Sequence, residues 1–269
     1  VQVNVAAALA YAFRNQPSAI CSAEMSTGKT RISTAVAALL KSKRTLVFSP
    51  PHLVGKWKEE IETLLPGVQA TILRSITDVI QFASLPTKSP WPLFGILSRE
   101  RSKLSFAKRP ALIPKAVRLN QETYIHYLCP QCGTRVDNKD GIPQTPRSLK
   151  PGAKCNSCHT PLWTYDPSGP RRVALADYIG KKHPRLFYLL LVDEVQEEKG
   201  LGSAQGLAFA LLVQKCRRAL ALTGTLTSGK ATSIFHILWR MNPALKASFK
   251  HTDEPRWVDL MGTWETRSS

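Results

Sequence analysis

The stretch SAEMSTGKT, from Ser22 to Thr30, decides how the rest of this sequence is interpreted. It ends in Gly28-Lys29-Thr30, follows the apolar segment Ala19–Cys21 and leads into an amphipathic run that begins at Ile32. Strand, loop and helix form the context in which Gly-Lys-Thr binds phosphate, because backbone N–H groups at the helix N-terminus point at the anion. The stretch therefore predicts a phosphate-binding loop of the Walker A type.

Within this loop, Lys29 is expected to pair the β- and γ-phosphates of ATP, and the Thr30 hydroxyl is expected to hold Mg²⁺. Ser26, Thr27 and Gly28 complete the expected nucleotide-binding loop. Ser26 stands where a second glycine is common, and glycine is favoured where φ must be positive. The alternative is a chance Gly-Lys-Thr in a turn that starts a helix, so the surrounding sequence has to decide.

Apolar segments typical of buried strands alternate with helical patterns on both sides of the loop. Strands are expected at residues 44–49, 68–73, 93–97, 186–192 and 219–222, in addition to the strand that precedes the loop. This alternation predicts an α/β fold: a RecA-like doubly wound, mainly parallel sheet with helices on both faces. The expected division is a first part at 1–104, a small insert at 105–173, a second part at 174–245 and the start of a linker at 246–269.

An acidic pair follows the apolar strand at 186–192. The segment LVDEVQ, residues 191–196, places Asp193 and Glu194 at the carboxyl end of that strand. Asp193 is expected to hold Mg²⁺ through water, and Glu194 to orient or deprotonate the attacking water. The alternative is a solvated strand-to-helix turn, which the presence of the phosphate-binding loop disfavours.

With both motifs present, the sequence resembles the first RecA-like lobe of superfamily 2 helicases, most closely that of Swi/Snf-like ATPases. TLVFSPPHLVGKWKEEI, residues 45–61, is similar to motif Ia of that family, and LTGT, residues 222–225, matches motif III. DEVQ, residues 193–196, stands where members carry a DEAD/DEAH box. The resemblance covers about residues 2–243, apart from the insert.

The resemblance implies roles for further residues. Gln2 would contact the adenine, and Gln196 would join Lys29, Asp193 and Glu194 in catalysis. A nucleic-acid phosphate track and its coupling to the nucleotide would involve Ser49, Pro50, His52, Ser98, Arg99, Thr223, Gly224 and Thr225. The family also has a second RecA-like lobe that supplies arginine fingers, worth roughly 10³–10⁵ in rate. Without it, we expect this chain alone to bind nucleotide weakly and hydrolyse it poorly.

The charge balance indicates a polyanionic partner. There are 37 Lys and Arg against 19 Asp and Glu, a net charge of +18. This charge favours DNA as the partner, bound independently of its base sequence. No membrane partner is expected, because every unbroken apolar run, residues 186–192 among them, is far too short to span a bilayer. We expect a cytoplasmic or nuclear protein that is not secreted.

The insert carries Cys129, Cys132, Cys155 and Cys158 as two Cys-x-x-Cys pairs. Four thiolates on two tight turns supply tetrahedral coordination, which predicts a structural Zn²⁺ site with no open position for catalysis. Disulfides and redox chemistry are the alternatives, and His126 and His159 flank the pairs as substitute ligands.

Residues 99–185 hold 17 Lys and Arg against 6 Asp and Glu, so a basic zinc ribbon would add grip on DNA or RNA. Its aromatic residues could stack on bases or cover a small core, the more common role in so small a module. These residues are Tyr124, Tyr127, Trp163 and Tyr165. Outside the insert, Lys56 and Lys58 fit either a DNA contact or a solvated helix face.

Together these features predict the motor lobe of an ATP-dependent translocase that acts mainly on duplex DNA. A strand-separating DNA or RNA helicase shares the same first-lobe motifs and is an alternative. From another class, a nucleic-acid-binding recruitment module with a decayed ATPase is the second alternative, against which the intact Lys29, Thr30, Asp193 and Glu194 argue.

Overall fold

The computed structural model describes residues 1–24, 26–103, 108–119, 121–138, 140–166, 168, 173–199, 203–225 and 232–262. The chain divides into two units, which are described separately. The first, the α/β unit, comprises residues 1–104 and 173–269, and the second, the insert, comprises residues 105–172.

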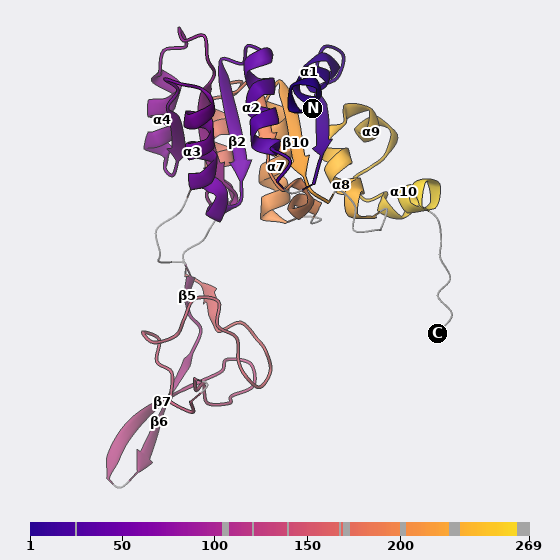
Figure 1. The fold of residues 1–269 in the computed structure, drawn as a ribbon. Coiled ribbons are helices and arrows are strands. Elements are labelled where there is room, and N and C mark those ends of the chain that lie inside the picture. The colour runs from indigo at the N-terminus through magenta and orange to yellow at the C-terminus, as the bar shows by residue number, and fades with distance from the viewer. Residues whose placement is uncertain are drawn as a thin grey trace. The chain divides into compact units, whose positions relative to one another are not determined.

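The α/β unit is built on one six-stranded sheet (Figure 1). Its strand order is β1-β10-β9-β2-β4-β3, and every neighbouring pair is parallel. The strands are β1 (Ser18–Ser22), β2 (Arg44–Ser49), β3 (Ala70–Leu73), β4 (Leu93–Ser98), β9 (Leu189–Val192) and β10 (Arg218–Thr223). The predicted parallel, doubly wound α/β sheet is confirmed. All carboxyl ends of these strands meet at one edge of the sheet, where the sequence motifs lie.

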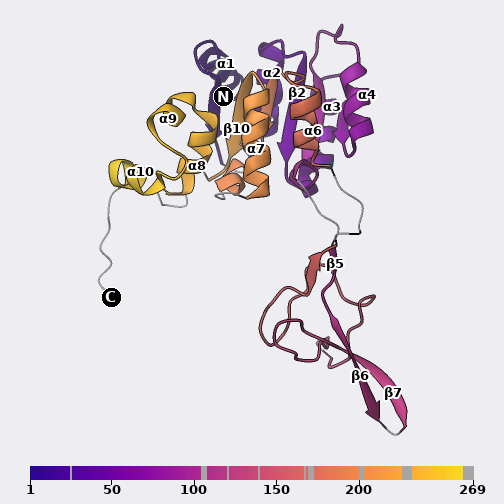
Figure 2. The same cartoon turned by 180° about the vertical axis from the view of Figure 1, so that it is seen from behind.

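Helices cover both faces of this sheet. Figure 1 shows α2 and α3 on one face, and Figure 2 shows α6 and α7 on the other. The helices up to the acidic turn are α1 (Gln2–Ala12), α2 (Lys29–Leu39), η1 (Pro51–Leu53), α3 (Val54–Leu64), α4 (Ile76–Ser84), α5 (Arg99–Ser102) and α6 (Leu175–Lys182). Those after it are η2 (Val195–Lys199), α7 (Ala204–Lys215), α8 (Thr232–Met241), α9 (Pro243–Ser248) and α10 (Glu254–Met261).

The strand side chains alternate between two cores. In β9, Leu189 and Leu191 pack with Val36 and Trp57 on the face of α2 and α3. Leu190 and Val192 pack on the opposite face, in the cluster that includes residues of α4, α6 and α7. Because a strand covered on both faces needs apolar residues at every position, β9 is a continuous apolar run rather than an alternating one.

Strand β9 is shorter than its sequence pattern predicts. The apolar run begins at Leu186, whereas β9 begins at Leu189. The N–H of Leu186 instead donates to the carbonyl of His183 in a turn, and the Phe187 ring stacks on Phe82 with 5.5 Å between centroids. The apolar run is therefore longer than the strand, because its first residues are buried by packing outside the sheet ladder.

The end of the described chain packs on α8. Residues 246–262, which we expected to begin a linker, include α9 in part and all of α10, and residues 263–269 lie outside the description. Phe249 and Trp257 are 9% and 8% exposed and pack edge-on against each other and around Phe235. Among the described helices, none has the length and apolar character that a bilayer crossing requires.

The insert contains two small antiparallel pairs and a core of its own. Strand β5 (Lys108–Pro110) pairs with β8 (Trp163–Tyr165), and β6 (Ile113–Leu119) forms a hairpin with β7 (Glu122–Leu128). The buried core consists of two of the cysteines with three aliphatic side chains, namely Cys129, Val136, Leu149, Cys155 and Leu162. So few apolar residues make a small core, which a metal site commonly reinforces.

Candidate nucleotide site and four-cysteine centre

The predicted phosphate-binding loop lies between β1 and α2. Gly28, just before the helix, has φ of 87°, and Ser26 has φ of 65°, so both occupy the left-handed region that glycine tolerates best. Thr27 Oγ1 donates to the carbonyl of Glu24 at 2.8 Å, which closes the loop on itself. Ser26 therefore adopts a backbone conformation that is unfavourable for serine. A glycine, which is common at this position of the loop, would adopt it without strain.

Lys29 lies over the inside of this loop. Its Nζ donates to the carbonyls of Ala23 at 2.9 Å and Glu24 at 3.0 Å. In the described part of the chain it forms no ion pair. The Lys29 ammonium group is thus held by neutral carbonyls, and its positive charge stays available to an anion. Thr30 is the second residue of α2 and is half-buried.

Gln2 contacts the same loop. Its Nε2 donates to the carbonyl of Thr27 at 2.9 Å, and a Cβ on Gly28 would lie 2.3 Å from that nitrogen. The positive φ of Gly28 is what favours glycine here, because the exposed Gln2 side chain could move away from a Cβ. The contact with adenine that the resemblance implies for Gln2 stays a prediction.

The acidic pair follows β9 at the same edge of the sheet. Asp193 is 7% exposed and accepts a hydrogen bond from Trp57 Nε1 at its Oδ2, at 2.8 Å. Burial raises the pKa of Asp193, the Trp57 bond acts in the opposite direction, and the Glu194 charge raises the pKa further. Glu194 has φ of 48°, a strained backbone of the kind that clusters at functional sites.

Trp57 is a site residue that sequence reasoning missed. Its apolar neighbours on α3 placed it in the core, where it is 3% exposed. A buried indole N–H nonetheless needs an acceptor, and this requirement is the signal that could have directed attention to a carboxylate. The acceptor is 136 residues away in the sequence, so only the fold identifies it.

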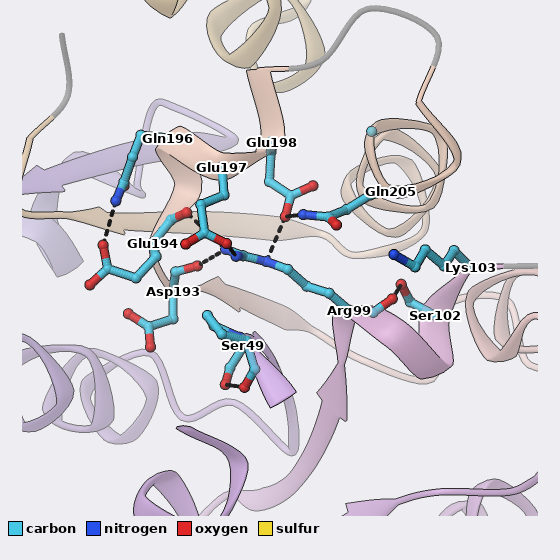
Figure 3. A network of polar contacts seen from close by, with 12 residues as sticks. Ser49, Arg99, Ser102, Lys103, Asp193, Glu194, Gln196, Glu197, Glu198 and Gln205 are labelled. Carbon is cyan, nitrogen blue, oxygen red and sulfur yellow. Dashed lines mark hydrogen bonds and ion pairs between the residues drawn. The ribbon is translucent and has the colours of Figure 1, made fainter. Parts of the chain in front are cut away.

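Gln196 connects the acidic pair to the end of β10. Its Nε2 donates to Glu194 Oε2 at 2.5 Å (Figure 3). Its Oε1 accepts from Thr223 Oγ1 at 2.7 Å. Thr223 Oγ1 in turn accepts from the Thr225 N–H at 3.1 Å, across Gly224. The DEVQ and LTGT segments, predicted separately from sequence, are thus joined by a continuous hydrogen-bonded chain.

Arg99 requires a correction. We placed it along a nucleic-acid track, but its side chain is 2% exposed and lies inside the α/β unit. Figure 3 shows it aimed at the turn after β9. It donates to the carbonyls of Asp193 and Glu194 and forms ion pairs with Glu197 and Glu198. A guanidinium has five N–H donors in a planar fork. The Arg99 donors are directed at these four acceptors inside the unit and not at a nucleic acid.

The partner Glu198 is itself fully buried. It pairs with Arg99 Nε at 2.6 Å and accepts a hydrogen bond from Gln205 Nε2 at 2.9 Å. Burial raises the pKa of Glu198 to about 7, against the lowering effects of Arg99, Gln205 and Arg240. Arg99 and Glu198 thus form a buried ion pair directly behind the acidic turn.

The other expected nucleic-acid contacts differ in accessibility. Ser49 and Pro50 are buried, and the Ser49 hydroxyl donates to the Pro50 carbonyl at 3.0 Å, so this hydroxyl is not presented at the surface as we expected. His52 is exposed, and Ser98 is half-buried with its hydroxyl capping α5 through the Arg101 N–H.

Lys56 and Lys58 lie on an exposed part of α3. Each pairs with a glutamate four residues later, Glu60 at 3.8 Å and Glu62 at 3.7 Å. Such pairs are typical of a solvated helix face, which favours that interpretation of the two lysines.

The four cysteines of the insert converge. Their sulfur atoms all lie within 4.8 Å of one another, with 3.6 Å between Cys129 and Cys158 and between Cys132 and Cys155. Tetrahedral thiolates about 2.3 Å from a Zn²⁺ ion would be roughly 3.8 Å apart. The structure therefore contains a four-cysteine cluster with the spacing of a closed metal site.

Two equivalent turns present these cysteines. In the first, the Gly133 N–H donates to the Cys129 carbonyl, and in the second the His159 N–H donates to the Cys155 carbonyl. Gly133 and His159 hold matching left-handed positions, with φ of 70° and 56°. His159 is therefore a turn residue, and no histidine belongs to the metal-ligand cluster found among the described residues.

The aromatic residues of the insert do not share one role. Trp163 packs on the core and its Nε1 donates to the Lys150 carbonyl at 2.8 Å. Tyr124, on the hairpin, is 48% exposed and contacts Glu122 through its hydroxyl, so it does not cover the core. Tyr127 is half-buried, and the Tyr165 side chain lies outside the description.

Comparisons with known proteins agree with this architecture. No protein-family model matches the chain, and no curated protein matches it in sequence. Among solved structures, the Sulfolobus solfataricus SWI2/SNF2 ATPase core in complex with dsDNA matches 95% of this chain, with a TM-score of 0.54 and 12% sequence identity. The chain corresponds to 37% of that protein's length. The fold that the sequence resemblance implied, a RecA-like lobe similar to that of a SWI2/SNF2 ATPase core, is thereby confirmed.

Proposed function

We propose that this chain is the nucleotide-binding lobe of an ATP-dependent translocase that moves on nucleic acid, mainly duplex DNA. The observation that carries the proposal is the convergence at one sheet edge. There the Gly28-Lys29-Thr30 loop follows β1, the acidic pair follows β9, and Thr223 ends β10. Phosphate-binding, acidic and coupling segments on adjacent parallel strands are what a Mg-nucleotide hydrolase needs.

The residues at this edge have distinct proposed roles. Lys29 would move from the loop carbonyls to the β- and γ-phosphates of ATP, and Thr30 and Asp193 would hold Mg²⁺. Bound there, Mg²⁺ would neutralise the charge that develops on the phosphates. Glu194 would orient the attacking water and accept its proton, while Gln196 would hold the Glu194 carboxylate through the bond at 2.5 Å.

The path from Glu194 through Gln196 to Thr223 also suggests how nucleic acid would affect hydrolysis. By resemblance, the LTGT segment couples the nucleic-acid track to the nucleotide. A displacement of Thr223 would release the Gln196 amide, and with it the Glu194 carboxylate. This coupling requires no direct contact between nucleic acid and ATP.

Further parts of the proposal concern the rest of the protein. We propose that residues 105–173 form a basic zinc ribbon with Zn²⁺ bound by Cys129, Cys132, Cys155 and Cys158, and that the ribbon adds sequence-independent affinity for DNA. The similar protein is described in complex with dsDNA, which supports duplex DNA as the partner. A second RecA-like lobe would supply arginine fingers, so this lobe alone would hydrolyse ATP slowly.

The test is steady-state ATP hydrolysis by the full-length protein with no nucleic acid, duplex DNA, single-stranded DNA and RNA. Glu194→Gln should abolish stimulation, whereas Glu60→Gln, a surface change on α3, should leave it intact. Stimulation by duplex supports the translocase, and unwinding of a partial duplex would favour a strand-separating helicase instead. No hydrolysis with any nucleic acid would refute the motor and favour a recruitment module.

A further inference from the structure

The α/β unit has a cavity at the opposite edge of its sheet, lined by basic and apolar side chains. The cavity measures about 710 Å³ and is lined by residues at the starts of β2, β9 and β10 and at the ends of α2 and α7. Because the strands are parallel, this amino edge lies across the sheet from the phosphate-binding loop and the acidic pair. Strand β9 alone separates the two edges by roughly 13 Å at 3.3 Å per residue. The cavity is therefore not part of the proposed nucleotide site.

The lining of this cavity is strongly cationic. Its charged side chains are all basic: Lys41, Lys43, Arg44, Arg185, Lys215 and Arg217. None of these six forms an ion pair with a carboxylate in the part of the chain that the structure describes. Surface cations elsewhere do find partners, as Lys181 does with Asp177 at 2.7 Å. Six like charges around one cavity repel one another, and a bound anion would relieve that repulsion.

Two of the guanidinium groups are held in place by neutral partners. Arg44 Nη2 donates to the carbonyls of Ala83 at 2.9 Å and Leu85 at 2.7 Å, while its Nε is buried without a hydrogen-bond partner. Arg217 lies over the Tyr188 ring, 5.8 Å from the centroid. Burial lowers the pKa of Arg44, because it removes water from around the guanidinium charge. Both groups are thus fixed beside the cavity, and neither has its charge neutralised.

We propose that this cavity binds a polyanion with two or more phosphate groups. Its volume is in the range of pockets that hold small ligands, and arginine forks match phosphate oxygens in a bidentate manner. Among the described residues, no acidic side chain lines the cavity, so the lining favours an anion over a cation. The same chemistry is offered by a nucleic-acid backbone and by a free polyphosphate, and the test separates these sources.

The experiment uses this chain with Lys29→Ala, which removes the phosphate-binding loop as a competing site. The cavity variant adds Lys43→Gln, Arg185→Gln and Arg217→Gln, three residues that are exposed and outside the cores. A charge-matched control adds Arg14→Gln, Arg74→Gln and Lys88→Gln, which are also exposed and do not line the cavity. Urea unfolding midpoints verify that both variants fold. Binding of tripolyphosphate is measured by calorimetry, and binding of a labelled DNA duplex by anisotropy over a range of salt concentrations.

The cavity variant should bind tripolyphosphate roughly tenfold or more weakly, since each charge-assisted contact is worth about that factor, and the control should not. If the backbone is the source, the slope of log affinity against log salt for DNA also falls by about 0.9 per lost phosphate contact. Loss confined to tripolyphosphate assigns the cavity to a free polyphosphate. Equal losses in the cavity variant and the control, or no loss in either, would overturn the proposal.

Discussion

Replacing the buried Arg99 by methionine tests whether its contacts with the carbonyls of Asp193 and Glu194 and with Glu198 stabilise the acidic turn. The change removes the ion-pair partner of the Glu198 carboxylate, which is 0% exposed, and leaves Arg240 as a nearby positive charge. Removal of one partner of a buried pair costs about 3–5 kcal/mol. The carbonyls of Asp193 and Glu194 lose their donor as well, at about 1–3 kcal/mol each where no water replaces it. Because effects within one network are not additive, we expect the free energy of unfolding to fall by about 3–5 kcal/mol in total.

The loss should depend on pH with a definite sign. In the folded protein, the pKa of Glu198 is raised to about 7, mainly by burial and despite Arg99. A raised carboxyl pKa means that the folded state binds the proton more tightly, so this group's contribution to stability declines as pH rises from about 4.5 towards 7. Without Arg99 the pKa rises further and the decline extends to higher pH. Arg99→Met should therefore be more destabilising at about pH 8 than at about pH 5.

Urea unfolding followed by far-UV circular dichroism at both pH values measures these losses. Lys56→Met is the matched control, because it removes a cation from an exposed pair on α3 and should change stability by less than about 0.5 kcal/mol. The double variant Arg99→Met with Glu198→Gln should recover part of the loss, since the buried carboxylate that Arg99 paired with is replaced by a neutral amide. A cost below about 1 kcal/mol for Arg99→Met, or one independent of pH, would refute the reasoning.

Three further predictions concern the phosphate-binding loop, the buried indole and the metal centre. Ser26→Gly should raise the free energy of unfolding by about 1 kcal/mol, because φ of 65° is disfavoured for serine; thermal denaturation checks it, and a lower melting temperature would contradict it. Trp57→Phe keeps most of the buried ring but deletes the bond to Asp193, so stability should fall by about 1.5–3 kcal/mol in urea titrations at neutral pH, and an unchanged midpoint would show that the bond contributes nothing. Chelation of metal from the four cysteines should unfold the insert while the α/β unit retains its far-UV signal, since the insert has its own core; loss of the whole signal would show that the two units unfold together.

Sequence patterns anticipated the sheet because its information is local. β2 was predicted over the same residues, 44–49, that form it, since a run of apolar residues bounded by turn signals identifies a buried strand. The two Cys-x-x-Cys pairs likewise predicted the four-cysteine cluster, because each pair forms its own local turn. Boundaries were less reliable where packing outside the sheet extended an apolar run, as at Leu186–Tyr188 before β9. The helices α9 and α10 were missed because Leu245 and Trp257 pack in a cluster with Phe235, which is distant in the sequence.

The sequence by itself determined where the predicted phosphate-binding loop, the acidic pair and the four-cysteine cluster occur, because each depends on residues that are close together in the chain. Tertiary structure alone decided which side chains face solvent and which satisfy one another. Arg99 is of a residue type that commonly contacts phosphate, yet in the fold it donates to the carbonyl of Asp193, 94 residues away in the sequence. The indole of Trp57 donates to the carboxylate of Asp193, 136 residues away. A charged or polar group buried in the interior must find a partner, and the partner's identity depends on which strands become neighbours in the sheet.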